Sequence, residues 1–297
     1  MAQILDGKIV RDKIAENLKS TIYDLSSKPQ LVIIQIGDLP ESNAYINQKI
    51  KFGERIGAIV ELKKIPADVT QKDLESLIYS LNSDSSVHGI IIQMPIPQNL
   101  DRDKLIDLIG PKKDADGLTL TNQKLLEENS PDAIIPATAK GVITILNYYK
   151  IPIKNKKVTV VGRSKLVGAP LATLFRNIGA QVTVCHSQTL DLKAETKNAD
   201  IIIVAVGKPN LITKDHVSPG QTIIDVGINV LEASKDKVNP SASRINLEAE
   251  RKLTGDVNFK EIEPIVAAIT PVPGGIGPMT VASLFENLLQ AYEKQAS

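Results

Sequence analysis

The chain has 297 residues, about twice the usual length of one domain, so two domains are expected. Hydrophobic residues make up 42% of it and charged residues 23%, which excludes a disordered chain and allows a sizeable core. A net charge of +1 removes the electrostatic argument for nucleic acid or an anionic membrane as a partner.

The cysteine and histidine content excludes two further classes of protein. Cys185 is the one cysteine, so no intrachain disulfide can form, and the three histidines lack metal-ligand spacing. No apolar run approaches the ~20 residues of a membrane span, and the amino terminus has no basic stretch followed by a long apolar one. These features predict a cytoplasmic protein without a metal site.

Apolar runs alternate with segments of helical period in both halves, which predicts an α/β protein with mainly parallel sheets. In the first half, residues 31–36 and 89–94 are continuous β-branched runs, typical of strands covered on both faces. Residues 8–25 and 74–81 place apolar side chains on one helical face, so two covering helices are expected there.

The second half has the pattern of a doubly wound, Rossmann-type domain. A helix is expected over 171–178, with Pro170 in its first turn and Gly179 at its carboxyl end. By composition, the polar segment 150–157 is the best candidate for the connector between the two halves. The last helix is expected over 278–293. The predicted strands cover 158–162, 181–185, 200–207 and 222–227.

A glycine turn follows the first of these four strands. Gly162 and Gly168 precede a helix start, the setting in which backbone amides and a helix amino terminus hold a phosphate. The spacing is not the common G-x-G-x-x-G. Glycines used only for their positive φ angle are an alternative that the turn by itself leaves open.

The surroundings of this turn favour NADP over NAD. The end of the next strand reads Cys185, His186, Ser187, without the acid that binds the ribose hydroxyls of NAD. Arg163 and Ser164 offer a guanidinium and a hydroxyl to a 2′-phosphate. The alternatives are an ordinary surface arginine and a loop histidine without a function.

Residues 41–51, ESNAYINQKIK, form a second candidate site. Ser42 suits a helix cap, and Tyr45 and Lys49 lie four residues apart on one helical face. Beside an apolar stripe the lysine would be desolvated, which lowers its pKa towards a range useful for proton transfer. A snorkelling lysine on an amphipathic helix is the alternative that the spacing alone favours.

Two further segments place polar groups where ligands bind. Gln93 follows a buried run and so lies at the carboxyl end of a central strand, where open α/β sheets bind ligands. Asp114 and Asp116 precede Gly117 in a loop that could present one carboxylate to a ligand. The alternatives are an Asx turn for each aspartate and a solvated amide for Gln93.

Together these segments resemble the bifunctional methylenetetrahydrofolate dehydrogenase/cyclohydrolase family over essentially the whole chain. Eight motifs in the family's order are far more specific than any one of them. They are SNAYINQKIK (42–51), GIIIQMPIP (89–97), KDADGLT (113–119), VVGRSKLVGAP (160–170), CHS (185–187), DVGIN (225–229), GDV (255–257) and TPVPGGIGPMT (270–280).

The resemblance implies two α/β domains with a cleft between them. One is a folate-binding catalytic domain over 1–138, completed by the helix over 272–297, and the other is an NADP-binding Rossmann-type domain over 139–271. The implied activity is the NADP-dependent oxidation of 5,10-methylenetetrahydrofolate and the hydrolysis of the methenyl product to 10-formyltetrahydrofolate. The implied setting is one-carbon metabolism and purine biosynthesis, and the implied assembly is a homodimer.

The resemblance also implies roles for single residues. Lys49 looks like the family's catalytic lysine, and Gln93 like the amide that tunes it. Tyr45 matches the ring that stacks on folate, and Asp116 matches the pterin anchor. The implied substrate-binding set further contains Ile92, Met94, Pro273, Gly274, Gly275, Ile276 and Gly277, and the cofactor-binding set Gly162, Arg163, Ser164, His186, Ser187 and Ile228.

One departure from the family pattern is Ala139, which stands where a second proline is common and predicts a less rigid helix start. A formate-activating ligase activity is not expected, because the chain lacks the length and the G-x-x-x-x-G-K-[ST] loop. Two rival interpretations remain open: an NADP-dependent dehydrogenase of another small substrate, and a nucleotide-sensing protein without catalysis. A sensor would have an emptied first-domain site, whereas its four candidate residues are all present.

Overall fold

The structure, a computed structural model, describes residues 1–231 and 252–296. These residues form an α/β fold with parallel sheets, which confirms the predicted class. They divide into two compact units: unit 1 consists of Met1–Lys8 and Ile145–Gly277, and unit 2 of Ile9–Thr144 and Pro278–Ser297. Among the described residues no helix has the length and apolar character needed to cross a bilayer.

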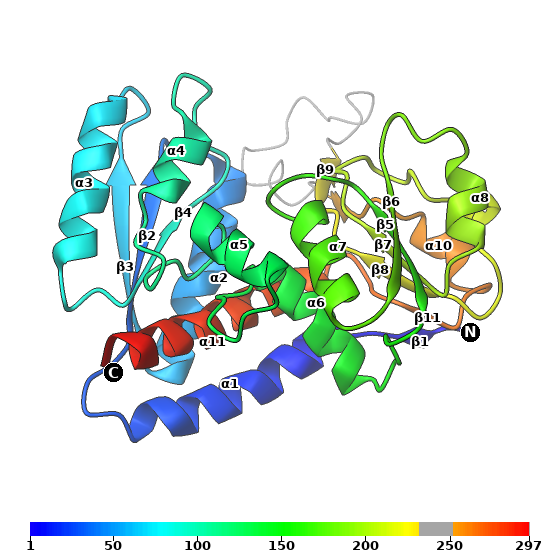
Figure 1. The fold of residues 1–297 in the computed structure, drawn as a ribbon, viewed down its shortest axis with the longest axis horizontal. Coiled ribbons are helices and arrows are strands. Elements are labelled where there is room, and N and C mark those ends of the chain that lie inside the picture. The colour runs from blue at the N-terminus through cyan, green and yellow to red at the C-terminus, as the bar shows by residue number, and fades with distance from the viewer. Residues whose placement is uncertain (232–251, 297) are drawn as a thin grey trace, which may run out of the picture. The chain divides into compact units, whose positions relative to one another are not determined.

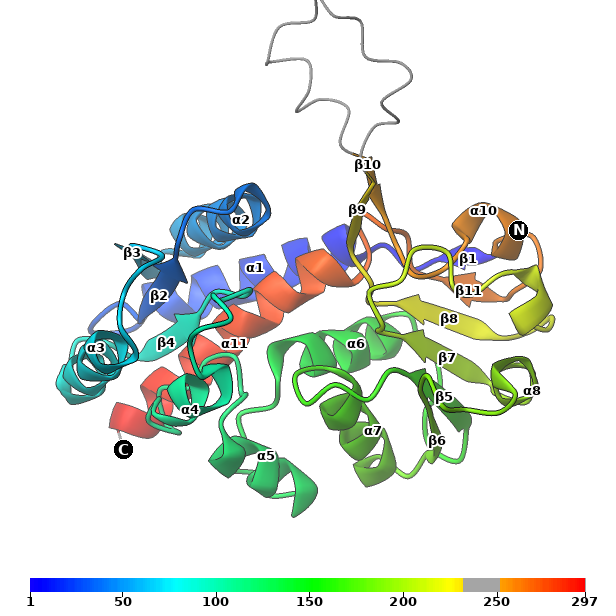
Figure 2. The same cartoon turned by 90° about the horizontal axis from the view of Figure 1, so that it is seen from above.

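Unit 2 is built on a three-stranded parallel sheet with the order β3 (Ile59–Ile65), β2 (Gln30–Ile36), β4 (Gly89–Ile92). Helices α3 (Gln71–Ser83) and α4 (Arg102–Asp107) cover one face through a cluster of buried aliphatic side chains. Figure 2 shows α2 (Pro40–Ile56) on the opposite side of this sheet from α3.

The face of the sheet that α2 covers also meets the last helix, α11 (Ile276–Ala296). The rings of Phe52 and Phe285 lie 5.2 Å apart between these two helices. A Cβ at Gly89 of β4 would come within 2.7 Å of Leu288, so α11 packs directly on the sheet at this strand. The other helices of this unit are α1 (Gly7–Tyr23), α5 (Leu120–Glu127) and α6 (Ala137–Tyr148), of which α1 and α6 extend into unit 1.

Unit 1 is built on a six-stranded parallel sheet with the order β1, β11, β8, β7, β5, β6 (Figure 1). Helix α7 (Gly168–Asn177) packs on β5 and β6, and α8 (Leu192–Lys197) and α10 (Phe259–Ile262) join a buried cluster on the other face. This is the predicted doubly wound arrangement. The strands are β1 (Gln3–Ile4), β5 (Lys157–Val161), β6 (Gln181–Cys185), β7 (Ile201–Val204), β8 (Thr222–Asp225) and β11 (Ala268–Ile269). A separate antiparallel pair is formed by β9 (Asn229–Leu231) and β10 (Lys252–Thr254).

Three local expectations differ from the structure. Ser42 does not cap α2, because the helix begins at Pro40 with Leu39 as its cap residue and no side-chain cap bond. The polar segment 150–157 lies within unit 1, so it does not connect the two units. The strand that precedes Gln93 is not central, because β4 lies at an edge of the three-stranded sheet, beside β2.

Candidate active site

The candidate lysine and amide meet in unit 2. Lys49 lies on α2 and is 7% exposed, and its Nζ donates a hydrogen bond to Oε1 of Gln93 at 3.0 Å. Gln93 directly follows β4, where its backbone N–H donates to Ile34 O of β2. The side-chain Nε2 of Gln93 donates to Met94 O at 2.8 Å, which fixes the amide so that its oxygen accepts from the lysine.

Ser42 contributes to the same arrangement. It lies seven residues before Lys49 on α2, and therefore on the same helical face. Its Oγ donates to Met94 O at 3.2 Å, so the helix is attached to the strand-end segment at two places. Sequence reasoning gave Ser42 a capping role because serine before a helical pattern is most often a cap.

Asp114 and Asp116 have opposite environments in the loop that follows α4. Asp114 is 1% exposed and accepts from Leu118 N, Thr119 N and the side-chain amide of Asn122 at 2.8–3.1 Å. The carboxylate of Asp116 accepts no hydrogen bond from the described residues. The structure therefore gives Asp114 the turn-stabilising bonds, and the role of Asp116 towards a ligand stays a prediction.

Lys49 and Asp116 influence each other's ionisation. Burial lowers the pKa of the Lys49 amine, and the charge of Asp116 partly opposes that shift. Burial raises the pKa of the Asp116 carboxyl, against the effect of Lys49 and together with that of Asp114. Burial also raises the pKa of Tyr45, which lies one helical turn before Lys49. An amine with a lowered pKa loses its proton at a lower pH than a solvated surface lysine does. The buried Lys49 amine is therefore suited to exchange a proton with a ligand.

The other expected substrate residues differ in their surroundings. Ile92 is 5% exposed, and its side chain belongs to the apolar cluster under α3 and α4, against which Met94 also packs. In unit 1, the 273–277 segment folds back on the start of the chain, where Gly7 N donates to Gly274 O at 2.9 Å. A Cβ at Gly275 would lie 2.6 Å from Pro271 O, so this glycine is needed for the turn itself.

The glycine turn of unit 1 joins β5 to α7. Gly162 has a φ of +127°, and a Cβ there would lie 2.3 Å from Ala205 O. A Cβ at Gly168 would lie 2.3 Å from Gly162 O. Ser164 accepts hydrogen bonds from Val167 N and Gly168 N, so its hydroxyl caps the first turn of α7. Both glycines thus have a packing role in addition to any ligand role.

The expected cofactor residues lie at the carboxyl edge of the six-stranded sheet. Arg163 and Ser187 are exposed and follow β5 and β6, which are neighbours in the sheet and end in register at Val161 and Cys185. No carboxylate directly follows β6. His186 Nδ1 accepts from Gln188 N, so it shapes the loop, and the exposed Ile228 follows β8 on the same edge.

Sequence reasoning missed a pair of buried carboxylates on this edge. Asp225 accepts from Gly227 N, Asp256 N and Val257 N. Asp256 accepts from Val206 N, Gly207 N and the Asn229 side chain. Burial raises the pKa of Asp225 to about 7, although its three backbone donors act in the opposite direction. Both residues stand in motifs noted above, DVGIN and GDV, where an aspartate beside glycine was the available signal.

A doubly wound unit with a glycine turn, together with a separate unit holding a buried lysine, defines a two-part α/β enzyme of the nucleotide-dependent dehydrogenase class. Comparison with known proteins narrows this class. The model of the tetrahydrofolate dehydrogenase/cyclohydrolase catalytic domain matches residues 5–116, and that of the NAD(P)-binding domain of the same family matches residues 136–296.

Individual relatives cover nearly the whole chain. The bifunctional protein FolD of Acholeplasma laidlawii is 42% identical over 292 residues, which are 98% of this chain and 99% of the relative. The crystal structure of the bifunctional FolD enzyme of Campylobacter jejuni has a TM-score of 0.91 at 38% identity, covering 99% of both chains. The Trypanosoma brucei enzyme, complexed with NADP cofactor and inhibitor, has a TM-score of 0.89 at 32% identity and covers 99% and 98%.

The chain belongs to the tetrahydrofolate dehydrogenase/cyclohydrolase family. The expected resemblance is thereby confirmed, and so are the enzyme class and the NAD(P)-binding domain.

Proposed function

We propose that this chain oxidises 5,10-methylenetetrahydrofolate with NADP⁺ and hydrolyses the methenyl product to 10-formyltetrahydrofolate. The observation that carries the proposal is the buried Lys49 amine bonded to Gln93, in the electrostatic field of an Asp116 carboxylate that accepts no hydrogen bond from the residues the structure describes. Asp116 accepts from the amino group and a ring N–H of the pterin, and Tyr45 stacks on its ring.

The first reaction depends on geometry. Removing hydride from the methylene carbon leaves a cation that the lone pair of an adjacent nitrogen stabilises, so no proton acceptor is needed. Bound NADP⁺ supplies the hydride acceptor. The task of the protein is to orient the folate, through Asp116, Tyr45 and the 273–277 segment.

The second reaction needs a proton carrier. Water adds to the methenyl carbon and loses a proton, and a ring nitrogen gains a proton as its bond to that carbon breaks. The Lys49 amine takes the first proton and returns one to the nitrogen. Gln93 supports this role because its oxygen accepts from the neutral amine and keeps the lysine aimed.

The residues at the carboxyl edge of unit 1 fit a cofactor with a 2′-phosphate. The exposed guanidinium of Arg163 and the hydroxyl of Ser187 follow neighbouring strands, and the two residues directly after β6, His186 and Ser187, carry no carboxylate. Gly162, Ser164, His186 and Ile228 complete the set proposed to hold NADP.

A direct assay tests the proposal. The purified chain is mixed with 5,10-methylenetetrahydrofolate and NADP⁺, and NADPH formation is followed by its absorbance. Methenyltetrahydrofolate is then supplied alone, and the loss of its absorbance reports hydrolysis. Turnover of neither compound, by a folded protein that binds NADP⁺, would refute the proposed function.

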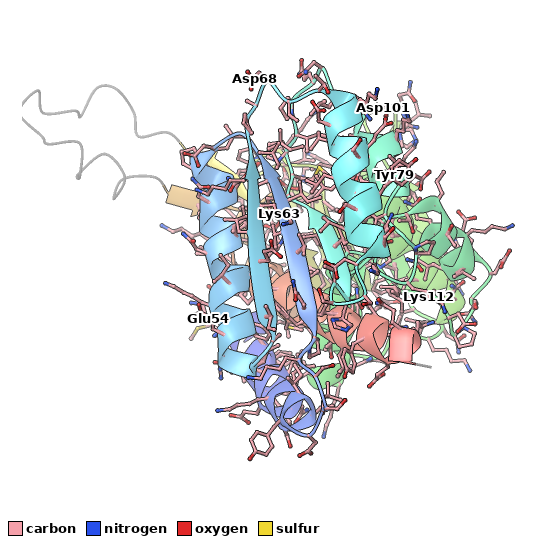
Figure 3. The ribbon with its side chains drawn as sticks, turned by 90° about the vertical axis from the view of Figure 1, so that its left-hand side faces the viewer. Glu54, Lys63, Asp68, Tyr79, Asp101 and Lys112 are labelled. Carbon is pink, nitrogen blue, oxygen red and sulfur yellow. The ribbon has the colours of Figure 1, made fainter. Side chains whose placement is uncertain are left out.

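The proposal also covers assembly and setting. We infer a homodimer in the cytoplasm that supplies one-carbon units, including those used in purine biosynthesis, with domain limits at 138/139 and 271/272. Support for self-association comes from β3, which is one of the two edge strands of its sheet and presents an exposed Ile59. Figure 3 shows this edge with Lys63 on β3, between Glu54 of α2 and Tyr79 of α3. Light scattering on the purified protein measures the oligomeric state.

A further inference from the structure

Asn287 on α11 is a fully buried amide whose hydrogen bonds are all made inside unit 2. Its Nδ2 donates to Ala115 O at 2.9 Å and to Ile135 O at 2.8 Å, and its Oδ1 accepts from Lys140 Nζ at 3.0 Å. Both amide hydrogens and the oxygen are therefore used, each by a different segment of the chain.

These bonds meet at the turn that carries Asp116. Ala115 is the residue before Asp116, and Ile135 lies two residues before the start of α6. Asp116 O accepts from Ala137 N at 3.1 Å, and a Cβ at Gly117 would lie 2.5 Å from Ile134 O. The Asp116 turn and the segment before α6 thus lie against each other, and the Asn287 amide joins them from the side of the last helix.

An amide is the side chain that these partners require. Two backbone carbonyls need donors, and a buried ammonium needs an acceptor that does not have to be a carboxylate. Aspartate has the same size but would place an oxygen against the two carbonyls, and alanine would leave both carbonyls without a donor. Lys140 is partly buried, which lowers the pKa of its amine, and the charge of Glu286 on α11 opposes that shift.

We propose that Asn287 is a positioning residue for the folate reactions, which fixes the Asp116 carboxylate at the place where it meets the substrate. The inference rests on the proposed function. Through Asn287, α11 contributes to substrate recognition, although Asn287 lies 171 positions from Asp116 in the sequence.

The test uses three variants of the full-length chain. Asn287→Ala and Asn287→Asp remove the two donated bonds, and the second of them does so without creating a cavity. Gln290→Ala is the matched control, because Gln290 lies on the same helix and its Nε2 donates to Ala133 O at 3.2 Å, two residues before the Ile135 carbonyl that Asn287 contacts. kcat and KM for 5,10-methylenetetrahydrofolate, the dissociation constant of NADP⁺ and the thermal midpoint are measured for each.

We expect both Asn287 variants to lose about 10- to 100-fold in kcat/KM, mostly through KM, because a small misplacement of a contact residue has effects of this size. NADP⁺ affinity and the KM of Gln290→Ala should stay within about twofold of wild type. If Asn287→Asp keeps a wild-type KM, the side chain only fills space and the inference is wrong. The inference is also wrong if KM rises and NADP⁺ affinity falls by the same factor, because the effect would then not be specific to the folate.

A double variant separates positioning from general stability. In an Asp116→Asn background, which keeps one acceptor oxygen for the pterin and so retains a measurable KM, Asn287→Asp should lower the thermal midpoint as much as it does in wild type but should raise KM no further. A further rise in KM, equal to the rise that Asn287→Asp causes in the wild type, would overturn the inference. Failure of the proposed function is recognised separately, because the wild-type chain would then fail to turn over the substrate at all.

Discussion

Replacing Lys49 by methionine should separate the two reactions. Methionine keeps much of the length and the apolar stem, but it removes the amine that donates to Gln93. Loss of a general acid/base typically slows a reaction about 10²- to 10⁴-fold, which corresponds to about 3 to 5 kcal/mol of barrier. We expect the hydrolysis of methenyltetrahydrofolate to slow by that factor. Dehydrogenation should fall less, because it needs orientation and no proton carrier.

The environment of Lys49 limits the cost of this substitution to folding. The side chain is 7% exposed, so the folded protein already bears the desolvation of its amine, and removing the amine relieves it. The opposing loss is one hydrogen bond to Gln93, worth about 1 kcal/mol. The thermal midpoint should therefore change little, and a loss of activity cannot be attributed to unfolding.

The pH dependence gives an independent readout. Burial lowers the pKa of Lys49, so the neutral amine that acts as the base becomes available below the ordinary lysine range. The hydrolysis rate of the wild type should rise with pH through that lowered pKa and then level off, whereas Lys49→Met should lack this rise. Lys51→Met, which alters an exposed lysine on the same helix, is the control. Near wild-type hydrolysis by Lys49→Met would refute the proton-carrier role.

Three further predictions concern the charged residues. Arg163→Ala should weaken NADP⁺ binding by about 1.5 to 3 kcal/mol and NAD⁺ binding much less, and equal effects in titrations with the two cofactors would show that Arg163 does not contact the 2′-phosphate. Asp116→Ala should abolish folate binding and both activities while leaving NADP⁺ affinity and the thermal midpoint almost unchanged, and a variant that unfolds or still binds folate would contradict the anchoring role. The pKa of Asp225 is raised to about 7 in the folded protein, so the unfolded chain loses this proton at a lower pH than the folded protein does. As the pH rises from about 4 to about 7, the wild type should therefore lose about 4 kcal/mol of stability relative to Asp225→Asn. Denaturant unfolding at several pH values measures the difference, and parallel curves for the two proteins would contradict the raised pKa.

The central strands could be predicted because both of their faces are buried. β2, β5, β7 and β8 are buried almost throughout and rich in valine and isoleucine, and each was expected within a few residues of its observed position. β3 could not be recognised, since it is an edge strand in which Glu61, Lys63 and Lys64 interrupt the aliphatic residues. The strands β1 and β11 have two residues each, which is too short for a sequence pattern. They are defined only by pairing, because β11 pairs with β8 and β1 pairs with β11.

The site was predicted as far as local spacing allows. The one-face arrangement of Tyr45 and Lys49 and the strand-end place of Gln93 follow from helix and sheet geometry. Asn287 could not be found in this way, because its partners are backbone carbonyls far away in the sequence. The same applies to Asp225 and Asp256, whose partners are backbone N–H groups of other strand ends.

The contrast between Asp114 and Asp116 gives a last prediction, in which two neighbouring acids should fail in opposite ways. Asp114→Ala leaves Leu118 N, Thr119 N and the Asn122 amide without their buried acceptor. Each unsatisfied donor costs about 1 to 3 kcal/mol, so Asp114→Ala should lower the free energy of unfolding by several kcal/mol. Asp116 accepts no hydrogen bond from the described residues, so the same substitution there should remove affinity for folate and leave the fold intact. Denaturant unfolding and substrate KM, measured on both variants, decide the matter: a stable Asp114→Ala with impaired folate binding would reverse the assignment of the two carboxylates.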